Sequence, residues 1–211
     1  MDARIALVRR SYGEYDDSIF PDDYYRIPGV RCYQDVDAVR RYAYERILTY
    51  RGQTVELYVN GGMAVELLLA LQAAVKLNIK VIVCHRDNST HEFRRQQLIW
   101  KPIDHDDCEA GKEEGPFFSL CGERHFGMSD TAIFENVPSE CVFDFAWQEK
   151  CVREALTPYS HKQVSIAVTG LKPLLISVLN VACDLDIQIT WLHYDSDREE
   201  YFAQPMDKII L

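Results

Sequence analysis

The sequence lacks the features of a membrane protein, a secreted protein and a zinc-binding protein. Its 211 residues contain no apolar run of about 18 residues, the length that crosses a membrane. The N-terminal segment has no long apolar core and soon becomes acidic, so we expect a cytoplasmic protein without a signal peptide or a membrane partner. The seven cysteines are scattered and form no Cys-x-x-Cys pair, which argues against a disulfide framework and a structural zinc site.

Positive charge is also scarce. The chain has 23 Lys and Arg against 33 Asp and Glu, a formal net charge of -10. Duplex nucleic acid requires a broad basic face, so we do not expect it as a partner. One small anion, held by backbone amides and a few local cations, is compatible with this charge. The acidity fits an ordinary soluble protein, and also a protein that imitates nucleic acid in the basic groove of a partner.

What the sequence does contain is an internal repeat. The stretches 62–96 and 170–204 are identical at ten of 35 aligned positions, and most of the others pair apolar with apolar residues. Weaker similarity extends upstream, where Arg10-Ser11-Tyr12-Gly13 aligns with Arg124-His125-Phe126-Gly127. Repetition of this kind determines the fold. We therefore predict two copies of one domain, residues 1–101 and 116–211, joined by an acidic linker at 102–115.

Strands alternate with helices in each copy. One predicted helix has Val39, Tyr42, Ala43, Arg46 and Ile47 at three- and four-residue spacing. The predicted strands in the two copies are 4–8 and 117–121, 30–34 and 141–145, 54–59 and 163–168, 80–85 and 187–193, and 92–96 and 200–204. This order predicts an α/β fold of two tandem Rossmann-like lobes, with mainly parallel sheets, helices on both faces and a pseudo-twofold relation between the lobes.

A short polar turn with glycine joins a strand to a helix in each copy. In parallel sheets, ligands bind beyond the carboxyl ends of strands, where glycine allows close approach and the helix N-terminus attracts anions. Asn60-Gly61-Gly62 and Thr169-Gly170 are therefore candidates for binding a phosphate. Lys172 adds a charge to the second turn, and Ala64 stands at the matching place in the first. A tight turn that needs glycine only for its backbone explains the same residues.

The turns after the first strands combine cations with aromatic residues. A cation can bind a phosphate while a ring stacks on a base, so these turns are candidates for nucleotide binding. A solvated turn with a buried ring is the alternative. The candidate residues are Arg9, Arg10, Ser11 and Tyr12 in the first copy, and Arg124, His125 and Phe126 in the second.

A His-x-Asp pair ends a later strand of each copy, His85 with Asp87 and His193 with Asp195. Two residues apart on a strand, the side chains share a face and can bind a metal or act as acid and base. No third metal ligand is evident in the sequence, so we predict no metal site. An Asp that caps the strand end beside a half-buried His is the favoured interpretation.

The turn in "VTGLKPLLI", residues 168–176, resembles the ligand loop of CRISPR-associated Rossmann-fold (CARF) domains. Thr169, Gly170, Lys172 and Pro173 match that loop, and "VNGGMAV", residues 59–65, keeps the glycines but not the Lys. The resemblance implies that a cyclic oligoadenylate binds in a site between the two repeats. Some members of the family, the ring nucleases, cleave the ring without metal or cofactor.

The resemblance also implies roles for particular residues. Lys172, Arg10 and Arg124 would stabilise the charge that develops on the phosphorus, and His125 would act as acid or base. Our first hypothesis is therefore a stand-alone ring nuclease or sponge, either a monomer with pseudo-dimeric lobes or a homodimer. An acidic inhibitor of a nucleic-acid-binding defence enzyme is the second. A Rossmann-like enzyme or sensor for another nucleotide is the third.

Overall fold

The chain divides into two compact units, Met1–Leu98 with Ile210–Leu211, and Ile99–Ile209. The structure is a computed structural model, and each unit is described by itself. It describes residues 3–8, 23–26, 36–59, 64–99, 114–121, 131–134, 137–167, 172–195 and 200–205. Glu114 and Gly115, which we expected in the linker 102–115, already belong to a strand, and residues 101–113 lie outside the described part.

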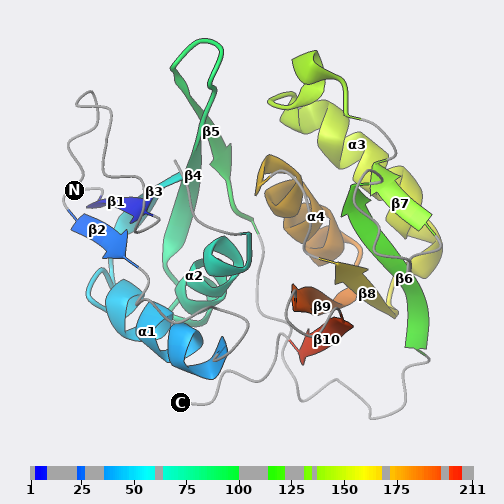
Figure 1. Cartoon of the computed structure of the whole chain (residues 1–211), viewed down its shortest axis with the longest axis horizontal. Helices are drawn as coiled ribbons and strands as arrows, with labels where there is room; N and C mark the ends of the chain where they lie inside the picture. The colour runs from blue at the N-terminus through cyan, green and yellow to red at the C-terminus, as the bar shows by residue number, and fades with distance from the viewer. Residues whose placement is uncertain are drawn as a thin grey trace. The chain divides into compact units, whose positions relative to one another are not determined.

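The first unit is a five-stranded sheet with two helices (Figure 1). The strand order is β2-β1-β3-β4-β5, and only β5 runs antiparallel to its neighbour. Its elements are β1 (Ala3–Val8), β2 (Asp23–Arg26), α1 (Val36–Leu48), β3 (Thr54–Val59), α2 (Ala64–Lys76), β4 (Lys80–Arg86) and β5 (Phe93–Gln97).

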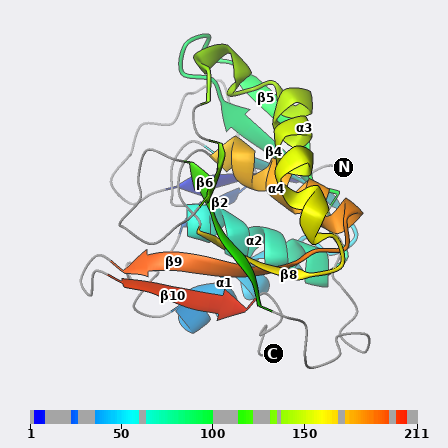
Figure 2. The same cartoon turned by 90° about the vertical axis from the view of Figure 1, so that its right-hand side faces the viewer.

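The second unit repeats this arrangement. Its strand order is β10-β9-β8-β6-β7, and again only the last strand in sequence is antiparallel, pairing with β9 (Figure 2). The elements are β6 (Glu114–Cys121), β7 (Thr131–Phe134), η3 (Ser139–Cys141), α3 (Phe145–Leu156), η4 (Thr157–Tyr159), β8 (Gln163–Ala167), α4 (Lys172–Asp184), β9 (Gln188–Asp195) and β10 (Glu200–Pro205).

The prediction of an α/β fold with mainly parallel sheets is confirmed. Read from β2 and from β7, the two sheets have the same order and the same strand directions. Duplication of one ancestral half would account for this identity of topology. The duplication stays a prediction, and so does the pseudo-twofold relation between the lobes. No helix of the described residues is long and apolar enough to cross a membrane.

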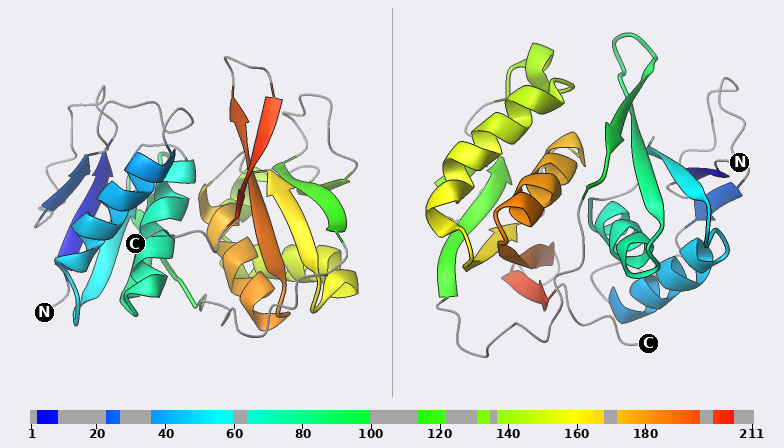
Figure 3. Two further views of the ribbon diagram at one scale, coloured as in Figure 1. Left: turned by 90° about the horizontal axis from the view of Figure 1, so that it is seen from below. Right: turned by 180° about the vertical axis from the view of Figure 1, so that it is seen from behind.

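The helices of each unit form one layer, not two. Within the described residues, α1 packs beside α2, and α3 packs beside α4, so each pair shares one face of its sheet (Figure 3). The prediction of helices on both faces is wrong for the described elements. The two helical connections of the first unit, β2–α1–β3 and β3–α2–β4, cross the sheet in the same direction, and so do β7–α3–β8 and β8–α4–β9 in the second. Right-handed crossovers that run in one direction place their helices on the same face of the sheet.

The core lies between the helices and the sheet. Val39, Ala43 and Ile47 of α1 are buried as the spacing predicts. Helix α2 is buried at every residue of 65–74, and α4 at every residue of 173–182, so both are enclosed on all sides rather than amphipathic. In the sequence, these two helices directly follow the glycine-containing segments that join them to β3 and β8.

One predicted strand, 141–145, is wrong. Residues 141–145 form no strand, because Asp144 starts a helix there by accepting a hydrogen bond from the Trp147 backbone N–H (3.0 Å). The second strand of that unit is instead β7. Its counterpart in the first unit, β2, ends at Arg26, and the predicted strand 30–34 lies outside the described residues.

Candidate functional site

Strand pairing brings the ends of two strands to one edge in each unit. β1 and β3 are parallel neighbours with Leu7 opposite Val59, and β6 and β8 are parallel neighbours with Ser119 opposite Ala167. The segments that follow these strands therefore leave the same carboxyl edge of their sheet, where parallel sheets bind ligands. Most predicted site residues lie in these segments, outside the described residues: Arg9, Arg10, Ser11, Tyr12, Asn60, Gly61, Gly62, Arg124, His125, Thr169 and Gly170.

Lys172 is the predicted site residue that the structure describes. It is half-buried and is the first residue of α4, immediately after the turn that follows β8. A cation at a helix N-terminus opposes the helix dipole, so helix formation does not account for a lysine here. The first turn of α4 contains no acidic residue, whereas that of α2 contains Glu66, which is 6% exposed. The two helix starts thus differ in charge, and the second favours an anion.

His85 lies near the carboxyl end of β4. It is opposite Val59, the last residue of β3, and faces the helices with Val83. Its side chain is 3% exposed, and Nε2 lies 3.0 Å from Oε1 of Gln96 on β5. The histidine is therefore fully buried, not half-buried as we expected, and it joins the two strands of the β4–β5 hairpin.

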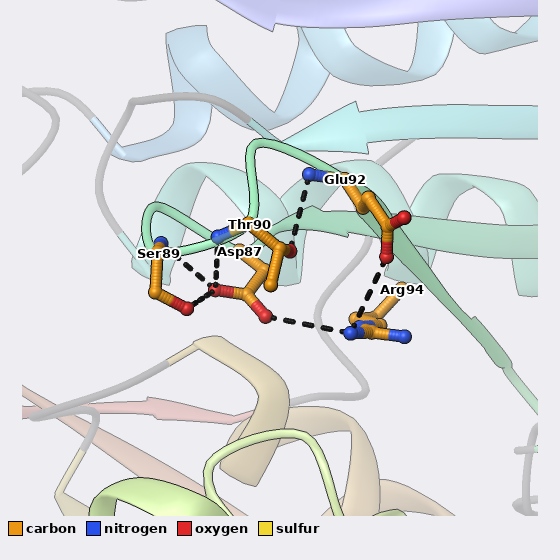
Figure 4. A network of polar contacts seen from close by, with 5 residues as sticks. All are labelled: Asp87, Ser89, Thr90, Glu92 and Arg94. Atoms are coloured by element: carbon orange, nitrogen blue, oxygen red, sulfur yellow. Dashed lines mark hydrogen bonds and ion pairs between the residues drawn. The ribbon is translucent and has the colours of Figure 1, made fainter.

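Asp87 organises the turn of the same hairpin (Figure 4). Its Oδ1 accepts hydrogen bonds from the Ser89 backbone N–H (2.9 Å), the Ser89 hydroxyl (2.5 Å) and the Thr90 backbone N–H (3.4 Å). Its Oδ2 lies 3.7 Å from Nη2 of Arg94, which also pairs with Glu92 at 3.4 Å. The favoured interpretation, an Asp that caps the strand end, is confirmed for this copy.

This arrangement assigns Asp87 a structural task. The hydrogen bonds from Ser89 and Thr90 outweigh burial and lower the pKa of Asp87 to about 2, so it is a carboxylate at neutral pH and a poor general acid. Within the described ranges, no group of three or more His, Cys, Asp and Glu can hold a metal ion. The side chains of His193 and Asp195 lie outside the described part.

Replacing Asp87 by asparagine is expected to remove an acid-dependent part of the stability. The folded-state pKa is lowered, so the stabilisation is fully present above about pH 4, the unfolded value, and is lost as the pH falls to about 2. Urea unfolding at pH 7 and at pH 2 measures this: the difference between wild type and Asp87→Asn should shrink at pH 2. An equal difference at both values would contradict it.

A cluster that the sequence did not predict lies on the face of the first sheet that carries no described helix, called the helix-free face below. Glu56 on β3 is 6% exposed, and it pairs with Arg95 on β5 through Oε1 and with Arg4 on β1 through Oε2 (3.9 Å). The Tyr58 hydroxyl donates to the same Oε2 at 2.9 Å. A glutamate in the middle of the otherwise apolar strand 54–59 was the one signal in the sequence. Its partners are far away in the chain.

Burial and this carboxylate suppress the acidity of two neighbours of Glu56. Burial first, and then the hydrogen bond to Glu56, raise the pKa of Tyr58 to about 12. Burial first, and then the charge of Glu56, raise the pKa of the Cys84 thiol to about 11. Tyr58 and Cys84 are therefore protonated at neutral pH, so this cluster contains no ready nucleophile or base of these two types.

Comparison with known proteins defines the fold more closely than the sequence does. No protein-family model matches the chain, and no curated protein matches it. Among solved structures, it is similar to the Acinetobacter baumannii Cap4 SAVED/CARF-domain containing receptor, at 9% identity and a TM-score of 0.51. The similarity covers 97% of this chain but only 49% of the receptor, so the chain spans about half of the receptor's length. The chain therefore has a SAVED/CARF-like α/β fold.

Proposed function

We propose that this chain binds a cyclic oligoadenylate and acts on it as a metal-independent ring nuclease or as a sponge. The observation that supports this most is the fold, which resembles a SAVED/CARF-domain receptor over 97% of the chain. It agrees with the independent resemblance of residues 168–176 to the CARF ligand loop. The ligand would be held by the segments that follow β1, β3, β6 and β8.

The charge distribution supports a small anionic ligand rather than duplex nucleic acid. The net charge of -10 disfavours broad contact with phosphates. Local anion binding needs only backbone N–H groups, a helix dipole and one or two cations. The start of α4 supplies the dipole and Lys172, with no acidic residue in the first turn.

Ring cleavage would follow the chemistry of an RNA phosphodiester. The 2′-oxygen attacks the neighbouring phosphorus, the bond from phosphorus to the 5′-oxygen breaks, and the products are a 2′,3′-cyclic phosphate and a 5′-hydroxyl. The 2′-hydroxyl proton passes to a base, and the leaving 5′-oxygen receives one. In this proposal His125 exchanges the proton, and Lys172, Arg10 and Arg124 stabilise the charge on the phosphorus oxygens.

Incubation with cyclic tri-, tetra- and hexa-adenylate in EDTA, followed by chromatography over time, tests the proposal. Linear products from one ring size would establish a metal-independent ring nuclease. An intact ring that co-elutes with the protein would establish a sponge or a sensor. If the ring is neither cleaved nor co-eluted with the protein, the proposal is refuted. That result would favour the acidic inhibitor, whose binding depends on surface carboxylates and not on the glycine turns.

A further inference from the structure

The helix-free face of the first sheet combines cations with an aromatic pair. We call it the arginine face and define it by Arg4, Glu56, Tyr58, Lys80, Arg86, Phe93 and Arg95. The register places these residues together: Arg4 is opposite Glu56, Tyr58 and Arg95 are both opposite Cys84, and Arg86 is opposite Phe93. Alternation along each strand then directs them away from the helices, whose face is lined by Ile5, Leu57 and Val83.

Charge is concentrated on this face in an otherwise acidic chain. Its described side chains include one carboxylate, Glu56, and four cationic groups, which are those of Arg4, Lys80, Arg86 and Arg95. The other acidic groups near β5, Asp87 and Glu92, pair with Arg94 on the opposite face. The arginine face is therefore net cationic, although the whole chain is at -10.

Glu56 fixes the two arginines without neutralising the face. Its side chain is 7% exposed, while those of Arg4 and Arg95 are 53% and 55% exposed. Nε of Arg4 lies 3.9 Å from Oε2 of Glu56, and Nη2 of Arg95 pairs with its Oε1. The side chains are thus held at one end by a buried anchor, while solvent reaches more than half of each.

Aromatic rings lie between these cations. The rings of Tyr58 and Phe93 meet edge to face, with centroids 5.1 Å apart. Both side chains are half-buried. Beyond them, Arg86 donates to Nδ1 of His91 at 3.2 Å. Alternating cations and rings on a rigid sheet are the surface on which single strands bind, since phosphates meet the cations and bases stack on the rings.

Among the described strands of the second unit, the residues at the matching positions do not repeat these charges. By strand register, Arg4 corresponds to Phe117 and Glu56 to Ser165. By the sequence repeat, Lys80, Arg86 and Arg95 correspond to Gln188, Tyr194 and Ala203. None of these residues is charged. The arginine face is therefore not a requirement of the fold, since the same sheet forms without it.

From this geometry we propose that the arginine face binds a single-stranded oligonucleotide. The proposal uses none of the residues of the glycine turns and does not depend on the binding of a cyclic oligoadenylate. An acidic peptide would use the cations but not the rings, and the experiment distinguishes the two.

Fluorescence anisotropy with a labelled single-stranded RNA of mixed sequence, at low salt, tests the proposal. Arg95→Gln and Arg4→Gln should each weaken binding about tenfold and reduce the salt dependence by about 0.7 in logarithmic slope, the value for one lost phosphate contact. Arg94→Gln is the matched control, because it removes the same charge from the same strand on the opposite face. It should change the affinity less than about twofold.

Four results would overturn the proposal. The first is that the wild type does not bind the RNA, and the second is that Arg94→Gln weakens binding as much as Arg95→Gln. The third is that a polyglutamate peptide binds as tightly as the RNA, which would show a site for acidic proteins. The fourth is displacement of the RNA by a cyclic oligoadenylate, which would place the RNA at the glycine turns. Melting curves check that each variant is folded. If Arg95→Gln proves unstable, the result for Arg4→Gln decides the test.

Discussion

Lys172→Ala is expected to weaken the binding of cyclic oligoadenylate about ten- to a hundredfold while the chain stays folded. In the proposed site, the ammonium group meets a phosphate at the start of α4, where the helix dipole also favours an anion. A hydrogen bond to a charged group contributes about 1.5–3 kcal/mol, so its loss weakens binding about ten- to a hundredfold. Isothermal titration with the ring that the wild type prefers measures this directly.

Lys162→Ala is the control for Lys172→Ala. Lys162 is exposed and precedes Gln163, so it lies at the amino end of β8, and Lys172 follows the carboxyl end. Both variants lose one positive charge from the same unit, and only Lys172→Ala should weaken binding. Gly170→Val tests the turn itself, because a side chain there should block close approach of the backbone to the ligand. Unchanged affinity in both Lys172→Ala and Gly170→Val would exclude the turn as the site.

The order of helices and strands could be predicted because local patterns determine it. Val39, Ala43 and Ile47 repeat every fourth residue, and all three are buried in α1. The strands β3 and β4 are short apolar runs bounded by turns. The repeat then gave each element twice, which is why both units were predicted with the same sequence of elements.

The misplaced strand 141–145 and the strands β2 and β7, which were not predicted, depended on contacts that local patterns do not contain. Residues 141–145 resemble a strand, but the Gln148 side chain donates to the carbonyl groups of Cys141 (3.1 Å) and Val142 (2.7 Å) and holds them in a turn. The true strands β2 and β7 lie at sheet edges and pair on one side only, with β1 and β6. Short edge strands have little apolar signal of their own.

The same limit applies to the candidate sites. The capping role of Asp87 could be predicted, because its partners Ser89 and Thr90 follow within three residues. The arginine face could not, because Arg4, Glu56 and Arg95 come from three strands and meet only when the sheet forms. Residues far apart in sequence are brought together by strand order, which a single sequence does not specify.

Trp191→Ala is expected to destabilise the second unit by about 3–5 kcal/mol, the usual cost of removing a large core aromatic side chain. Trp191 is 0% exposed and lies on β9 opposite Ile166 of β8, on the face that carries the helices. Because the chain has three tryptophans, the substitution changes the fluorescence signal itself, so unfolding in urea should be followed by circular dichroism.

Two controls separate the loss of packing at Trp191 from a general weakness of β9. Thr190 is the adjacent residue on the other face and accepts a hydrogen bond from the Gln163 side chain (2.7 Å), so Thr190→Ala should cost only about 1 kcal/mol. Val83 holds the matching position in the first unit and is also 0% exposed. Val83→Ala removes far fewer atoms and should cost less than Trp191→Ala. If Trp191→Ala costs no more than either control, the tryptophan does not contribute the core packing that its burial predicts.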